Sequence, residues 1–61
     1  MLIDSETILQ QVKDEDILII HTVYGRTIRG HWYDDHILGQ LSAAESFTEI
    51  GPKEYQRNDV Y

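Results

Sequence analysis

The feature that most constrains the fold is the run from Asp16 to Leu41, DILIIHTVYGRTIRGHWYDDHILGQL, in a chain of 61 residues without cysteine. Its apolar stretches are rich in β-branched and aromatic residues, as is typical of strands. Two short polar breaks divide it, Tyr24–Arg26 and Asp34–Asp35, and Gly25 in the first break is free to adopt a positive φ. The run therefore predicts three short strands joined by two tight turns.

The length of the chain predicts one small domain, residues 1–61. Folding at this size buries only about 60% of the unfolded surface, so such domains commonly gain stability from a disulfide, a metal or a partner subunit. The lack of cysteine excludes a disulfide and a zinc–thiolate site, and therefore favours self-association. It also favours a reducing, cytoplasmic location.

The N-terminal residues predict the only expected helix. Asp4 precedes a run of helix-forming residues and is expected to cap a helix over Ser5–Lys13, with Ile3 and Ile8 spaced as a hydrophobic staple. The N-terminus carries acids where a signal peptide carries bases, and no apolar run approaches the roughly 20 residues that span a bilayer. We therefore expect an intracellular chain without a membrane partner.

The strand pattern predicts the fold class. Strands are expected at Ile17–Val23, Thr27–Tyr33, Ile37–Ala43, Ser46–Ile50 and Tyr55–Val60. Gly30 lies inside the second of them and predicts a bulge or a sharp bend, which lets a short sheet curl closed. The expected fold is mainly β: a small, strongly bent, five-stranded antiparallel barrel with a short N-terminal helix.

The charge distribution separates the middle of the chain from its two ends. Eleven acids against five bases give a net charge of −6, and residues 17–33 carry two arginines and no acid. An acidic chain repels phosphate backbones at long range. The net charge therefore disfavours RNA as a partner.

The densest polar cluster lies at His31–His36, HWYDDH, whose histidines and aspartates are possible ligands of a divalent metal. On a strand and a turn these side chains would point in different directions, so we interpret the segment as a capped turn with edge histidines. His21 could act as a general base, but we interpret it as hydrogen-bonded at the edge of the core. No serine lies in a nucleophile motif, and no glycine-rich phosphate loop occurs. We predict no enzyme activity, no cofactor and no metal site.

Aromatic residues and arginines of the middle segment are the candidate contact residues, because Tyr, Trp and Arg dominate binding hot spots. Trp32 shares a strand face with Ile28 and fits a core anchor as well as a contact residue. The residues predicted to bind a partner are Tyr24, Arg26, Arg29, Tyr33, Asp34, Asp35 and Arg57.

Three segments carry a resemblance to a known family. Tyr24–Gly30, Tyr33–Leu38 and Tyr55–Val60 are similar, in order, to the first hairpin, the aromatic-Asp segment and the closing strand of Sm-like proteins, which include bacterial Hfq. Arg57 stands where that family places a basic residue, and Leu38 stands where it has an RNA-contacting asparagine. The resemblance implies an RNA-binding ring of small barrels. A barrel of the Src-homology-3 type has the same layout.

The leading functional hypothesis is a non-catalytic protein-binding module that occupies a surface of a larger protein and self-associates. Small acidic chains of this kind resemble virus- or plasmid-encoded regulators and inhibitors, some of which mimic the charge of nucleic acid. The acids at 14–16, 34–35, 45 and 49 would carry such mimicry. One alternative is an Sm-like RNA-binding ring, and another is a small-molecule-binding oligomer with a pocket lined by His21, Tyr24 and Trp32.

Overall fold

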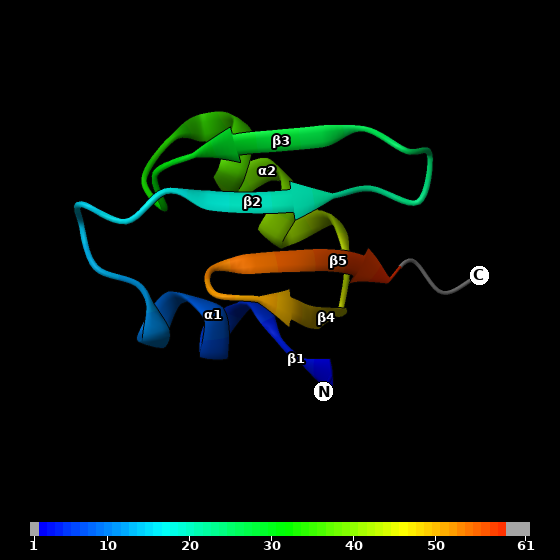
Figure 1. Cartoon of the computed structure of the whole chain (residues 1–61), viewed down its shortest axis with the longest axis horizontal. Coiled ribbons are helices and arrows are strands. Elements are labelled where there is room, and N and C mark those ends of the chain that lie inside the picture. Colours follow the sequence, from blue (N-terminus) through cyan, green and yellow to red (C-terminus); the bar gives the residue numbers. More distant parts are fainter. Residues whose placement is uncertain (1, 59–61) are drawn as a thin grey trace.

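The computed structural model describes residues 2–58, in which strands and helices follow one another in the order β1-α1-β2-β3-α2-β4-β5 (Figure 1). The elements are β1 Leu2–Ile3, α1 Ser5–Gln11, β2 Leu18–His21, β3 Thr27–Gly30, α2 Asp35–Ala43, β4 Ser46–Gly51 and β5 Glu54–Asn58. Neither helix of this part of the chain is long and apolar enough to cross a membrane.

The strands form one sheet in the order β1-β4-β5-β2-β3, which leaves β1 and β3 at its edges. Three neighbouring pairs are antiparallel, whereas β2 and β5 are parallel, with Ile20 opposite Tyr55. The sheet has five strands, but β1 was not predicted and replaces in number the strand expected at Ile37–Ala43; the predicted mainly β class is confirmed. The antiparallel barrel is not, because the sheet contains a parallel pair and its two edge strands do not pair with each other within residues 2–58.

The helix α2 occupies residues that the sequence pattern assigned to a strand over Ile37–Ala43. Ile37 and Leu41 are buried and lie four residues apart, the spacing that places two side chains on one face of a helix. Asp34 is at the N-cap position and Asp35 is in the first turn, where a negative charge suits the helix dipole. The prediction of a strand here was wrong, and these two aspartates begin a helix instead of joining two strands. The helix then connects β3 to β4, and β5 enters the sheet between β4 and β2.

Both helices contribute to the core on one face of the sheet, and Figure 1 shows α2 behind β2 and β3. The buried core residues are Ile3, Ile8, Leu18, Ile20, Ile37, Leu41, Phe47 and Tyr55. Fully burying one such apolar side chain contributes about 1.5–3 kcal/mol. Because strand side chains alternate between faces, the residues between the core positions point the other way. We call this other side the open face; on it lie Ile19, His21, Thr27, Arg29, Glu54 and Gln56.

The helix α1 begins as the sequence predicts. The side chain of Asp4 accepts a hydrogen bond from the Thr7 amide at 2.8 Å, which is an N-cap bond, and Ile3 and Ile8 both join the core. Hydrogen bonds from the side chain of Thr7 and, second, from its amide hold the pKa of Asp4 below its ordinary value. The helix ends at Gln11, two residues before the predicted end.

Gly30 has a different role from the predicted bulge. A Cβ atom at this position would lie 2.5 Å from His36 Nε2 and 2.8 Å from Asp34 Oδ2, so a larger residue would displace the ends of these two side chains at the start of α2. The strand β3 ends here, before the predicted end at Tyr33, and the irregularity of the sheet lies in β4 between residues 49 and 51. The expected strand at Tyr55–Val60 corresponds to β5, but its residues after 58 lie outside the described part of the chain.

Candidate functional site

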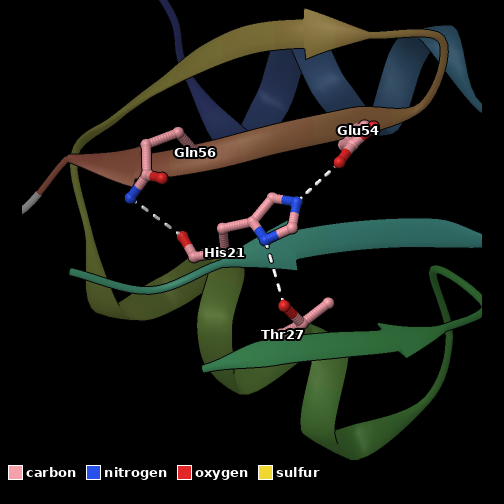
Figure 2. A network of polar contacts seen from close by, with 4 residues as sticks. All are labelled: His21, Thr27, Glu54 and Gln56. Atoms are coloured by element: carbon pink, nitrogen blue, oxygen red, sulfur yellow. Dashed lines mark hydrogen bonds and ion pairs between the residues drawn. The ribbon is translucent and has the colours of Figure 1, made fainter. Parts of the chain in front are cut away.

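A polar network connects three strands on the open face (Figure 2). The imidazole of His21 lies between β3 and β5, with Nε2 2.6 Å from Glu54 Oε2 and Nδ1 3.1 Å from Thr27 Oγ1. The side chain of Gln56 donates to the main-chain oxygen of His21 at 3.2 Å. The side chains of His21 and Glu54 are 27% and 35% exposed, so solvent reaches the network.

A hydroxyl, an imidazole and a carboxylate in one chain of hydrogen bonds can activate a nucleophile, but here the same bonds have a structural explanation. Thr27 and Gln56 are the strand partners directly opposite His21, and cross-strand partners lie close enough to bond. A neutral imidazole satisfies both contacts by donating from Nε2 to the carboxylate and accepting at Nδ1 from the hydroxyl. His21 is therefore hydrogen-bonded, as predicted, and it fastens β2 to β3 and β5 on the open face.

Two acidic segments that are distant in sequence meet at one end of the sheet. The indole Nε1 of Trp32 donates to Asp14 Oδ1 at 2.9 Å, which joins the α1–β2 loop to the β3–α2 connection; both lie at the left in Figure 1. We call the carboxylates of these two segments the acidic end; they are Asp14, Glu15, Asp16, Asp34 and Asp35. Together with Lys13 they give a formal charge of five negatives and one positive, or −4. Asp14, Glu15 and Asp35 are exposed.

Aromatic rings stand beside these carboxylates. Tyr33 is 49% exposed and stacks on His31, with ring centroids 5.0 Å apart and an interplanar angle of 9°. Trp32 meets the Tyr33 ring edge-on at 5.6 Å and packs against the core. It is only partly buried, and the fully buried aromatic residues of the core are Phe47 and Tyr55. Asp34 accepts a hydrogen bond from the His31 amide at 2.8 Å, as expected of a turn aspartate. Tyr33 is thereby held in an orientation that leaves about half of its surface exposed.

The seven residues predicted to contact a partner do not share one surface. Tyr24, 78% exposed, and Arg26 lie in the β2–β3 hairpin turn, at the end of the sheet opposite the acidic end (Figure 1). Arg29 lies on the open face of β3. Arg57 belongs to the helix side of β5, where its Nη1 donates to Gln40 Oε1 on α2 at 2.6 Å. Of the other three residues, Asp34 and Asp35 belong to the acidic end, and Tyr33 directly precedes them in the chain.

The residues of the proposed small-molecule pocket are also dispersed. His21 lies on the open face, Tyr24 in the hairpin turn and Trp32 at the acidic end. Within residues 2–58, no group of three or more His, Cys, Asp or Glu side chains is arranged to hold a metal ion.

The network residues Thr27, Glu54 and Gln56 were not among the predicted site residues. A signal for Thr27 was present, because a hairpin turn centred on Tyr24 places Thr27 opposite His21. Glu54 and Gln56 reach His21 only through the parallel pairing of β2 and β5, which joins residues at least 33 positions apart. No local pattern of the sequence indicates such a pairing.

The chain was also compared with known proteins. No family model matches the chain, and no curated protein or solved structure matches it significantly. The resemblance to Sm-like proteins stays a prediction that depends on the three segments quoted above.

Proposed function

We propose that the chain is a non-catalytic protein-binding module that docks its acidic end on a basic surface of a larger protein. The observation that carries the proposal is the hydrogen bond between Trp32 and Asp14, which holds two acidic segments together beside an exposed tyrosine. Opposite potentials on two surfaces steer their encounter and fix their orientation. A chain bound in this way regulates or inhibits its target by occupying a surface that the target uses for another acidic ligand, such as nucleic acid.

The carboxylates and Tyr33 have different tasks in this proposal. An exposed ion pair contributes only about 0–1 kcal/mol and is screened by salt, so the acidic end supplies mainly association rate and orientation. Tyr33 supplies apolar contact area, and its stacking on His31 restricts its rotamers before binding, which lowers the entropy lost in the complex. The satisfied hydrogen bonds of the His21 network support a structural role for the open face. The cysteine-free sequence supports a cytoplasmic location for this activity.

The test compares two double variants that change the net charge equally. Glu15→Lys with Asp35→Lys reverses two exposed charges of the acidic end. Glu6→Lys with Glu45→Lys reverses two exposed charges outside the acidic end, and Glu6, like Asp35, lies in the first turn of a helix. Glu45 was among the acids expected to carry the mimicry, but it directly precedes β4 and is not part of the acidic end in this proposal. We expect the wild type and the control to capture the same protein from host lysate. That protein is expected to bind the acidic-end variant about tenfold more weakly than the wild type, and its affinity for the wild type is expected to fall as the salt concentration rises.

Two results would contradict the proposal. One is a partner that binds both double variants equally, because the position of the charges would then not matter. The other is the absence of any protein enriched by the wild type over a column without bait. If the wild type retained RNA and the Arg29→Ala variant did not, the result would instead favour the RNA-binding alternative. The observation that supports this alternative is the exposed Arg29 on the open face.

A further inference from the structure

The strand β3 is an edge of the sheet, and half of its main-chain groups point away from the protein. The amide of Thr22 donates to the carbonyl of Arg26 at 2.9 Å across the hairpin, so this pair is a hydrogen-bonded pair of the ladder. Such pairs alternate with non-bonded pairs along antiparallel strands. Ile28 therefore bonds to β2, whereas the N–H and C=O groups of Thr27 and Arg29 are directed outward.

One of these outward groups is covered by a side chain. His36, in the first turn of α2, places Nε2 2.8 Å from the carbonyl oxygen of Arg29, to which it donates. In the described part of the chain no hydrogen bond is found to the amide of Arg29 or to the amide and carbonyl of Thr27. An edge with free donors and acceptors is a template for another strand, and a side chain that takes one acceptor opposes such pairing.

We propose that β3 pairs antiparallel with β3 of a second copy of this chain, and that His36 limits this pairing. With a twofold axis at Ile28, Thr27 of each copy lies opposite Arg29 of the other. Each of these two pairs exchanges two N–H···O=C bonds, which gives four in all. The half-buried Ile28 side chains, which pack against the core in each copy, then meet across the axis and extend the apolar contact.

Charge favours a second copy in this orientation over a parallel one. Arg29 faces the uncharged Thr27, so no two like charges stand directly opposite each other. The two ends of β3 carry opposite charge, because the hairpin turn holds Arg26 and the β3–α2 connection holds Asp34 and Asp35. Antiparallel pairing brings the turn of one copy beside the acidic end of the other. The inference does not rest on the proposed partner binding, and the variants that test it lie outside the acidic end.

Sedimentation or light scattering over a range of concentrations tests the pairing. We expect the weight-average mass of the wild type to rise from 7.1 kDa towards twice that value. In His36→Ala both Arg29 carbonyls become available, so the dissociation constant falls about tenfold. Arg29→Pro removes an outward N–H without breaking the ladder to β2 and is expected to remain a monomer. Arg29→Ala keeps the N–H and is expected to retain the pairing.

Amide exchange of the wild type tests the same pairing without a substitution. The amides of Thr27 and Arg29 are expected to exchange at least about tenfold more slowly at a concentration where the dimer dominates. The Ile28 amide, already paired within the chain, is the internal control. A mass of 7.1 kDa at every concentration for both the wild type and His36→Ala would overturn the proposal. So would exchange that is independent of concentration, or an assembly of more than two copies, since a twofold interface closes at two.

Discussion

The buried hydroxyl group of Tyr55 is expected to lower the stability of the fold. The tyrosine is 0% exposed, and its hydroxyl is the buried side-chain polar atom for which the described residues offer no hydrogen-bond partner. The substitution Tyr55→Phe removes that oxygen and leaves the ring, which fills the core beside Ile20 and Phe47. We therefore expect the variant to be more stable than the wild type.

The size of the gain follows from the cost of burying a polar group. A buried donor or acceptor without a partner costs about 1–3 kcal/mol, and relief of the lower part of this range predicts a gain of about 1 kcal/mol. In a domain of this size 1 kcal/mol corresponds to a shift of about 4–8 °C in Tm. Burial, followed by the charges of Glu49 and Asp16, also raises the pKa of Tyr55 above its ordinary value of 10.0.

The raised pKa makes the gain depend on pH. The folded chain holds the phenolic proton more tightly than the unfolded chain, so the wild type has its full stability below pH 10.0 and loses stability as pH rises from there towards the folded pKa. Tyr55→Phe lacks this loss, so its advantage is expected to widen in alkali. Urea unfolding at neutral and alkaline pH measures both effects, with Tyr33→Phe as an exposed control. A variant less stable than the wild type at neutral pH would refute the reasoning, because it would show that the hydroxyl has a partner.

Two further substitutions test the glycine contact and the helix cap. Gly30→Ala would place a Cβ 2.5 Å from His36 Nε2 and 3.0 Å from Ile37 Cγ1, and we expect a loss of about 1–3 kcal/mol in urea unfolding. Gly39→Ala meets nothing within 4 Å and is the control, with an expected gain of about 0.5–1 kcal/mol because alanine favours a helix; equal effects at the two sites would contradict the contact. The lowered pKa of Asp4 implies that its stabilising charge is fully present above pH 3.8 and is lost as pH falls through the folded pKa. Asp4→Asn keeps a capping side chain but should lack this acid-dependent loss when unfolding is followed below pH 4; the same loss in both proteins would show that another group is responsible.

The sequence predicts those features of the fold that depend on neighbouring residues. The N-terminal helix is recognised because its cap and staple lie within a few residues, and the β2–β3 hairpin because Gly25 supplies the positive φ, 83°, that its turn uses. The segment 37–43 is ambiguous, since a short apolar run fits a strand or a helix. The two aspartates before it do not resolve the ambiguity, because aspartate suits a turn and a helix start equally well.

The composition of the candidate site is easier to predict than its assembly. Residue type selects Tyr33, Asp34 and Asp35, which lie at the surface proposed to bind a partner, but it also selects Arg57, whose guanidinium is directed to α2. The bond from Trp32 to Asp14 spans 18 positions and depends on how two loops are folded, which no spacing reveals. That the two acidic segments lie side by side can therefore be seen only in the tertiary structure.

The sheet order has a consequence for how the chain folds. The strand β5 is the last described strand, yet it lies between β4 and β2 and alone connects the β1–β4 pair to the β2–β3 hairpin. The two halves of the sheet stay unconnected until residues 54–58 emerge from the ribosome, and Leu18, Ile20 and Phe47 stay incompletely covered until then. The pairing of β2 with β5 closes a loop of more than 30 residues, and the entropy of closing this loop is lost before the contacts between the two strands stabilise the fold. We therefore expect this step to slow folding. Completion of the core therefore follows synthesis of the strand at the centre of the sheet.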